Sequence, residues 1–370
     1  MLKVNLMKEF SRRDFLKLTG ASLGAMAFRR FEGILPANRF QFPEGEKLGR
    51  VSVFPNYYST PLKTEPHRAS TTIRDLGQDE LVIWSHEVVG SANSVSKRWV
   101  ETPEGYIYYP DLQPVHNFPN IPLTALPEGK PGFWAEVTVP YVDLIIANPP
   151  ARSGWYKTSL AQGFVPRLYY GQVVWIDQVT TNEMGLVMYR FNEKYGYGDI
   201  FWVDASGLYP LTPEDVSPIH PDVDPVQKKI VVNTTYQTLS CFEGETEIYF
   251  CRVSSGYDSE SYFTPPGGYN PHRKLFSIPM GASSTEGRSG YDTPAVGWPI
   301  FMAGNGIAIH AAFWHNDFGT RRSHGCINVC AEDAKWIFRW TTPYVSLDAG
   351  EVSLDWPDHG TIVDVVQRTF

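Results

Sequence analysis

A histidine and a cysteine at a defined spacing are the residues of this chain best suited to covalent chemistry. His310 precedes Cys326 by sixteen positions, and the cysteine lies in the run Ser-His-Gly-Cys-Ile-Asn at 323–328. A thiol becomes a good nucleophile only when a nearby base or an electropositive environment removes its proton. Gly325, directly before the cysteine, permits a sharp turn that presents backbone N–H groups. The pattern predicts a Cys–His acyl-transfer site in which such amides stabilise an oxyanion.

The stretches around these two residues resemble the L,D-transpeptidase (YkuD-type) catalytic domain. The family pattern is a histidine, a spacer, and then Ser/Thr-His-Gly-Cys followed by an apolar residue and Asn or Arg, which His310 and 323–328 follow. The resemblance covers about 225–370, where 264–267 (Thr-Pro-Pro-Gly) and 278–280 (Ile-Pro-Met) also match family positions. It implies a catalytic domain of the L,D-transpeptidase β-sandwich type.

The resemblance also implies roles for individual residues. Cys326 is then the nucleophile and His310 its base, with the main-chain oxygen of Ala311 fixing the imidazole tautomer. Amides around His324, Gly325 and Cys326 stabilise the oxyanion, Ser323 supports the same turn, and His324 is structural rather than basic. The residues expected to contact substrate are Tyr291, Asn305, Gly306, Asn328 and Arg322, the last beside Arg321. Ordinary turn chemistry for Asn305 and Gly306, and solvated surface charge for the arginines, are alternative interpretations.

The function implied is a peptidoglycan L,D-transpeptidase that cross-links tetrapeptide stems through a cysteine thioester, in cell-wall biogenesis and the maintenance of cell shape. Its partners are then peptidoglycan stem peptides, and no metal or organic cofactor is required. With water as the acceptor, the same site would be an L,D-carboxypeptidase, and the sequence does not separate these two reactions. A non-catalytic wall-binding protein is a third interpretation.

The same region admits a zinc-site interpretation. Two histidines and two cysteines are a known ligand set for structural zinc, and the chain offers His310, His324, Cys326 and Cys330. The spacing His-x-Cys-x3-Cys is not usual for a zinc knuckle, so we predict no metal ligands. Cys330 is expected instead at the start of a helix over 331–340, where Ser is a better N-cap than Cys.

Hairpin-type strands are expected to position the site. Alternating apolar residues and turn signals predict strands at 230–232, 238–242, 248–253, 306–309 and 360–366. The helix over 331–340 carries an apolar stripe of Ala334, Ile337 and Phe338. Cys241 and Cys251 flank the first hairpin, where they are either buried small hydrophobes or, in an exported protein, a disulfide.

Composition excludes several classes of protein. The 370 residues are 42% hydrophobic and 14% aromatic, with 29 Pro and 31 Gly, which favours mainly β, turn-rich domains. The net charge of −8, without a basic stripe, argues against a nucleic-acid binder. Beyond the N-terminus no apolar stretch is long enough to span a bilayer.

Two small modules are predicted before the catalytic domain. Short β-type runs fill 46–120 and 130–215, and a weak repeat links Trp99–Val115 with Tyr195–Leu211. The pattern resembles two SH3-like β-barrels, which either contact cell-wall glycan or serve as spacers. Proline-rich connectors between the modules predict semi-rigid spacers rather than strands. The catalytic domain then occupies 225–370.

The first 45 residues resemble a twin-arginine export signal. Ser11-Arg12-Arg13-Asp14-Phe15-Leu16-Lys17 matches the consensus, and a short, mildly apolar segment follows at 18–28. Ala25-Met26-Ala27 is a candidate cleavage site. We therefore predict export of the folded protein to the periplasm or cell wall, with no membrane segment after signal removal.

Overall fold

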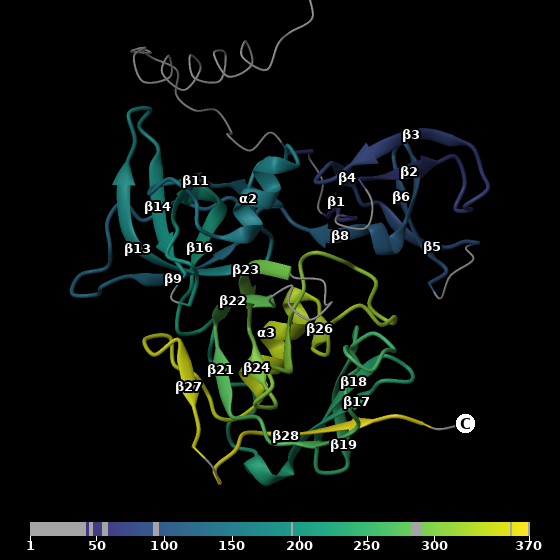
Figure 1. Ribbon diagram of the computed structural model, residues 1–370, viewed down its shortest axis with the longest axis vertical. Coiled ribbons are helices and arrows are strands. Elements are labelled where there is room, and N and C mark those ends of the chain that lie inside the picture. The colour runs from purple at the N-terminus through teal and green to yellow at the C-terminus, as the bar shows by residue number, and fades with distance from the viewer. Residues whose placement is uncertain are drawn as a thin grey trace, which may run out of the picture. The chain divides into compact units, whose positions relative to one another are not determined.

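The computed structural model describes residues 42–43, 47–53, 58–91, 96–193, 195–282, 291–355 and 357–368 (Figure 1). Residues 42–370 form one compact unit. The described part is mainly β, as predicted, and none of its helices has the length and apolar character to cross a membrane. The predicted export signal at 11–28 lies outside the described residues.

The first module, residues 47–115, consists of two antiparallel sheets. One contains, in spatial order, β4 (Leu81–Ile83), β1 (Leu48–Val51) and β8 (Leu112–Val115). The other contains β3 (Thr72–Gly77), β2 (Ser59–Lys63), β7 (Gly105–Tyr108), β6 (Arg98–Thr102) and β5 (His86–Val89). Val51, Leu62 and Val100 belong to a core that both sheets share.

The second module, residues 133–210, has a six-stranded antiparallel sheet. Its spatial order is β11 (Ile145–Ile146), β15 (Ile200–Asp204), β14 (Val187–Asn192), β13 (Val173–Thr181), β9 (Phe133–Val137) and β16 (Leu208–Pro210). The strands β10 (Tyr141–Asp143) and β12 (Arg167–Tyr169) pair separately. Between them in the chain lies α2 (Gly154–Ala161).

The weak sequence repeat between the modules corresponds to a repeated structural unit. In the first module, β7 leads through a one-turn 3-10 helix, η1 (Tyr109–Asp111), into β8. In the second, β15 leads through η2 (Ala205–Gly207) into β16. No sheet in the described ranges closes into a barrel by strand pairing. The SH3-like assignment and the predicted domain boundaries therefore stay predictions.

Two prolines of the connectors lie in strands, which corrects the expectation that they mark spacers only. Pro114 belongs to β8 and pairs with Gly49, and Pro210 ends β16 opposite Ala135. Each of these strands is at the edge of its sheet. Proline is tolerated there because an edge strand has one side without a hydrogen-bonding neighbour, so the missing N–H leaves no partner unsatisfied.

The C-terminal domain, which follows η3 (Pro225–Gln227), contains two five-stranded sheets. The first has the order β19 (Thr246–Arg252), β18 (Thr238–Glu243), β17 (Lys228–Asn233), β28 (Ile362–Val366) and β20 (Gly267–Tyr269). The second has the order β26 (Ile327–Val329), β25 (Ala308–Ala311), β24 (Ile300–Phe301), β21 (Arg273–Leu275) and β27 (Glu351–Ser353). The strands β22 (Ser277–Ala282) and β23 (Tyr291–Gly297) pair with each other. The predicted strands at 230–232, 238–242, 248–253 and 360–366 are confirmed.

The predicted helix is confirmed as α3 (Ala331–Trp340). Its apolar stripe, Ala334, Ile337 and Phe338, lies in one core cluster with residues of both sheets. The thiol of Cys330 accepts a hydrogen bond from the backbone N–H of Asp333 at 3.4 Å, so Cys330 occupies the N-cap position.

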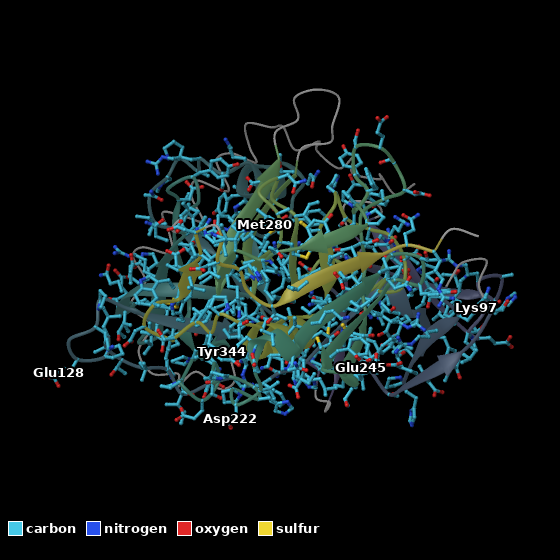
Figure 2. All side chains as sticks on the ribbon, turned by 90° about the horizontal axis from the view of Figure 1, so that it is seen from below. Lys97, Glu128, Asp222, Glu245, Met280 and Tyr344 are labelled. Atoms are coloured by element: carbon cyan, nitrogen blue, oxygen red, sulfur yellow. The ribbon has the colours of Figure 1, made fainter. Side chains whose placement is uncertain are left out.

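Charged side chains such as Lys97, Glu128, Asp222 and Glu245 point outward from the ribbon (Figure 2).

Candidate active site

His310 and the cysteine turn are brought together by two neighbouring parallel strands. The register of β25 and β26 places His310 opposite Asn328. Cys326 directly precedes β26 and lies two residues before Asn328. Because paired residues of neighbouring strands point to the same side of a sheet, this register places the side chains of Asn328 and His310 on one side. Residues sixteen positions apart in sequence thus become neighbours in space.

The His310 imidazole is held in one tautomer. Its Nδ1 lies 2.9 Å from the carbonyl oxygen of Ala311. A carbonyl oxygen only accepts hydrogen bonds, so Nδ1 carries the proton and Nε2 keeps its lone pair. The side chain is only 3% exposed, and this burial lowers the pKa of His310 to about 4. At neutral pH the ring is therefore an uncharged proton acceptor.

The Cys326 thiol is half-buried and hydrogen-bonded. Its Sγ lies 3.7 Å from the carbonyl oxygen of Gly306, to which it donates. Burial raises the pKa of Cys326 to about 11, and a hydrogen bond from the backbone of Ala308 opposes that rise. The resting site is thus a neutral thiol beside a neutral imidazole.

The turn before Cys326 is closed by side-chain hydroxyls. Ser323 Oγ donates to the carbonyl of Cys326 at 2.5 Å and accepts from Gly325 N at 3.1 Å. Thr264 Oγ1 donates to the carbonyl of Gly325 at 2.8 Å. Gly325 has a φ of +126°, a backbone conformation that residues with a side chain rarely adopt. The Ser323 bond occupies Gly325 N–H, which was one of the amides expected to face the oxyanion.

His324 and the arginines face different partners. His324 is exposed and meets the ring of Tyr262 edge-on, with centroids 4.5 Å apart. Arg322 Nη2 lies 2.7 Å from Asp317 Oδ2, and Arg321 donates to the carbonyl of Gly256 at 3.2 Å. Arg322 is therefore an ion-paired brace of the loop, rather than the solvated charge of the alternative interpretation. Its contact with substrate stays a prediction.

The remaining candidates lie in the turn before β25 and at the start of β23. Gly306, with a φ of +87°, is in the turn rather than in the strand predicted at 306–309, and its carbonyl accepts from the Cys326 thiol. Asn305 Oδ1 accepts from Ile307 N at 3.4 Å, which is turn chemistry. Tyr291 opens β23 opposite Ala282, but its side chain lies outside the described residues.

One buried histidine near the site was missed by sequence reasoning. His315 is 8% exposed, and its Nε2 lies 3.1 Å from the amide nitrogen of Asn328. Its Nδ1 accepts from Asp317 N at 3.3 Å, so Nε2 must carry the proton. Among the described side chains, Asn328 Oδ1 is buried without a hydrogen-bond partner. Turning the Asn328 amide by 180° brings Oδ1 to His315, so that Oδ1 accepts the hydrogen bond that His315 Nε2–H donates. No spacing rule marks His315, because it reaches Asn328 across a loop.

The cysteines and histidines do not assemble into a metal-type cluster. Within the described ranges no group of three or more His, Cys, Asp or Glu is placed to hold an ion. Cys330 caps α3 instead of joining His310 and Cys326. Cys241 and Cys251 are buried free thiols in the core of the C-terminal domain, which is the hydrophobe interpretation of that pair.

Comparison with known proteins gives a family for the C-terminal domain. Residues 227–365 match the family model of the YkuD L,D-transpeptidase catalytic domain. No protein of curated function matches the chain in a sequence search.

Several solved L,D-transpeptidases align with the chain at low similarity. A mutant of the Enterococcus faecium L,D-transpeptidase is 21% identical over 42% of this chain, with a TM-score of 0.30, and the alignment spans 56% of its own length. The Mycobacterium smegmatis L,D-transpeptidase is 15% identical over 49% of this chain and 90% of its own, also with a TM-score of 0.30. L,D-transpeptidase 3 from Mycobacterium tuberculosis is 17% identical over 53% of this chain and 91% of its own, with a TM-score of 0.29. The similarity to the L,D-transpeptidase catalytic domain family is thus a property of residues 227–365, the C-terminal domain of this chain.

Proposed function

We propose that the chain is a peptidoglycan L,D-transpeptidase that works through a Cys326 thioester. The observation that carries this proposal is the pairing of β25 with β26, which sets a tautomerically fixed His310 beside the cysteine turn. The family match of residues 227–365 supports the class of substrate. The substrate is then a peptidoglycan tetrapeptide stem that ends in D-alanine.

The proton moves during attack rather than before it. Since the pKa of Cys326 is raised to about 11 and that of His310 is lowered to about 4, a thiolate–imidazolium pair is disfavoured at rest. His310 Nε2 takes the thiol proton as the sulfur bonds to the carbonyl carbon of the stem peptide. The carbon–nitrogen bond then breaks, and His310 returns the proton to the departing D-alanine amine. A thioester remains on Cys326.

Oxyanion stabilisation is assigned to backbone amides of the cysteine turn. Each such donor contributes on the order of 3–4 kcal/mol to transition-state stabilisation in well-studied cases. Because Gly325 N–H is held by Ser323 Oγ, the amide of Cys326 itself is the leading candidate. The Ser323 bond then serves to keep the turn in its shape.

The second half-reaction decides the product. An amine from a neighbouring stem attacks the thioester, forms the cross-link amide and returns a proton to the sulfur. If water attacks instead, the product is a shortened stem and the enzyme is a carboxypeptidase. Both reactions use the same Cys326 and His310.

Cellular location and wall contact belong to the same proposal. The twin-arginine pattern at 11–17 supports export to the periplasm or cell wall, where peptidoglycan stems are available. The two N-terminal modules then present the catalytic domain to the wall, as glycan contacts or as spacers.

The test is intact-mass and product analysis with a disaccharide-tetrapeptide. We expect a transient adduct equal to the substrate minus D-alanine, followed by a cross-linked dimer, in the parent protein. Cys326→Ala should form neither. Cys330→Ser is the matched control, because serine also caps helices well, and it should behave like the parent. A tripeptide product without dimer would favour the carboxypeptidase, and an adduct that survives Cys326→Ala would overturn the proposal.

A further inference from the structure

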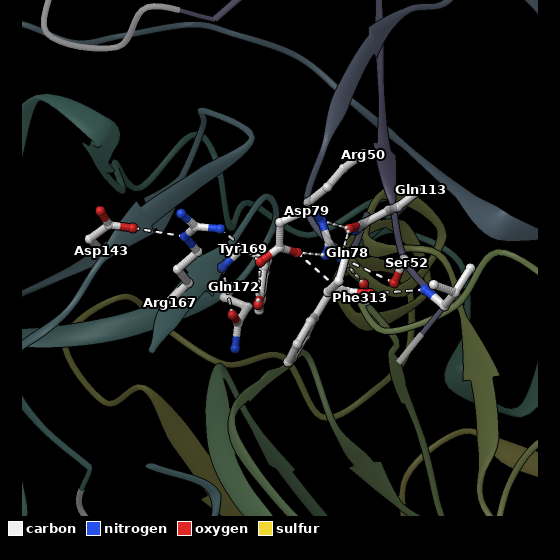
Figure 3. Close-up of polar contacts among 11 residues, drawn as sticks. Arg50, Ser52, Gln78, Asp79, Gln113, Asp143, Arg167, Tyr169, Gln172 and Phe313 are labelled. Atoms are coloured by element: carbon white, nitrogen blue, oxygen red, sulfur yellow. Dashed lines mark hydrogen bonds and ion pairs between the residues drawn. The ribbon is translucent and has the colours of Figure 1, made fainter. Parts of the chain in front are cut away.

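A buried arginine of the first module contacts the backbone of the catalytic loop. Arg50, in β1, is 1% exposed and donates from Nη2 to the carbonyl oxygen of Phe313 at 2.5 Å (Figure 3). Phe313 lies three residues after His310, in the loop that leaves β25. The contact therefore joins residues 263 positions apart and reaches the segment that carries the catalytic histidine.

Several groups fix the guanidinium in place. Arg50 Nη1 lies 2.6 Å from Asp79 Oδ1, and its Nε and Nη2 donate to Gln113 Oε1 at 3.0 and 2.5 Å (Figure 3). The guanidinium also stacks over the ring of Tyr169, 4.0 Å from its centroid. A planar guanidinium has a rigid fork of donors, so these contacts set the direction of the bond to Phe313.

Asp79 links the first and second modules at this point. Its Oδ2 lies 2.9 Å from Arg167 Nη1 and accepts from the hydroxyl of Tyr169 at 3.1 Å (Figure 3). Asp79 is itself buried and has a φ of +65°. A buried carboxylate between two guanidinium groups is compensated in charge, so the junction has a defined geometry.

Phe313 is held by its ring as well as by its carbonyl. The ring stacks on Tyr169 with centroids 5.2 Å apart and an interplanar angle of 23°. The centroid of the ring of the next residue, Trp314, lies 5.8 Å from that of His310. Phe313 and Trp314 therefore connect Arg50 to the His310 imidazole through direct contacts.

We propose that Arg50 is a positioning residue for His310, acting through the carbonyl of Phe313. This inference rests on the proposed acyl-transfer function, because it concerns the base of that reaction. The first module is then part of the catalytic apparatus. It fixes the end of β25, so that Nε2 of His310 faces the thiol of Cys326.

The experiment compares two reactions of Cys326 in the full chain. Acylation by a carbapenem at pH 7 needs His310 to accept the thiol proton, whereas alkylation by iodoacetamide at pH 10 uses thiolate formed by hydroxide. In Arg50→Met we expect acylation to fall about 10- to 100-fold, the range for a small misplacement of a catalytic group. Alkylation should stay near the parent rate, and Arg50→Lys should recover part of the loss.

Two further variants keep the test decisive. Gln113→Ala removes both hydrogen bonds from Arg50 to Gln113 without leaving an unpaired charge, and it should slow acylation by about threefold, the low end of the range for lost hydrogen bonds. It substitutes for Arg50→Met if that variant does not fold. Arg190→Met is the matched control, because Arg190 pairs with Asp177 within the second module at 2.8 Å. It should react like the parent.

The outcomes separate this inference from the proposed function. If the parent itself is not acylated, or Cys326→Ala still is, the proposed function fails. If the parent is acylated and the Arg50 and Gln113 variants match it, Arg50 has no positioning role. An equal loss of acylation and alkylation would mean general damage to the fold, and would also overturn the inference.

Discussion

The two N-terminal modules contact the catalytic domain in different ways. From the second module and its connector, Val173, Leu211 and Val216 belong to the same core cluster as Ile230, Ile309 and Ile337 of the catalytic domain. The first module keeps a separate core, which contains Val51, Leu62 and Val100. It meets the loop that follows β25 through polar bonds, from Arg50 to the carbonyl of Phe313 and from Asn316 to the carbonyl of Tyr109 at 3.4 Å.

These two kinds of contact have different physical effects. Apolar burial stabilises in proportion to area and has no direction, so the core shared with the second module contributes mainly to the folding of the catalytic domain. Hydrogen bonds from a buried guanidinium are directional, so the first module can set the geometry of one loop. The loss of these two kinds of contact should therefore have separable effects.

The largest effect is expected from Leu211→Ala, in the shared core. Removing a buried leucine side chain costs about 2–5 kcal/mol, and Leu211 is only 5% exposed. The variant should lower the urea midpoint at which the backbone amides of β17 and α3, in the catalytic domain, lose their protection against hydrogen exchange. Leu62→Ala, in the separate core of the first module, should lower the stability of that module and leave this midpoint nearly unchanged. Equal shifts in both variants would contradict the division between the modules.

A smaller, pH-dependent effect is expected at Glu193, where the second module contacts β23. Glu193 Oε1 accepts from Ala295 N at 2.7 Å, and burial raises the pKa of this carboxyl to about 7. Because the pKa in the folded state lies above the ordinary value, the folded protein favours the protonated carboxyl. The folded protein therefore loses stability as the pH rises from about 4.5, the ordinary pKa of the carboxyl, to about 7, its pKa in the folded state.

Glu193→Gln should therefore gain stability relative to the parent as the pH rises, by up to about 3 kcal/mol between pH 5 and pH 8.5. Urea denaturation at the two pH values measures the difference. Glu183→Gln, at an exposed position between β13 and β14, removes the same charge and serves as the control. A pH-independent difference between Glu193→Gln and the parent would show that the carboxyl does not ionise in this range.

Local patterns in the sequence predicted much of the catalytic domain. The strands that became β17, β18, β19 and β28, and the helix that became α3, follow from alternating or helical apolar spacing. Cys326 and His310 could be proposed as an acyl-transfer pair because Cys326 and its turn form a compact motif at a characteristic sequence distance from His310. These features depend on short stretches of chain, which sequence reasoning can evaluate.

The junctions between modules could not be predicted in the same way. Arg50, Asp79 and Phe313 meet across large separations, and each alone resembles an ordinary charged or aromatic residue. The edge-strand positions of Pro114 and Pro210 depend on which strands pair, which the prolines do not reveal. The capture of Gly325 N–H by Ser323 depends on one rotamer. Tertiary pairing, rather than local propensity, decides each of these features.

The proposed proton transfer from Cys326 to His310 is tested by the rate of carbapenem acylation as a function of pH, followed by intact mass. We predict a single adduct in the parent and none in Cys326→Ala. Because the pKa of His310 is lowered to about 4, the neutral base persists in mildly acidic solution, and the rate should stay nearly constant from pH 5.5 to pH 9. A rate that falls on acidification with a midpoint near pH 6.5, the ordinary pKa of histidine, would contradict proton transfer between a neutral thiol and a neutral imidazole. An adduct that persists without Cys326 would contradict the role of this thiol.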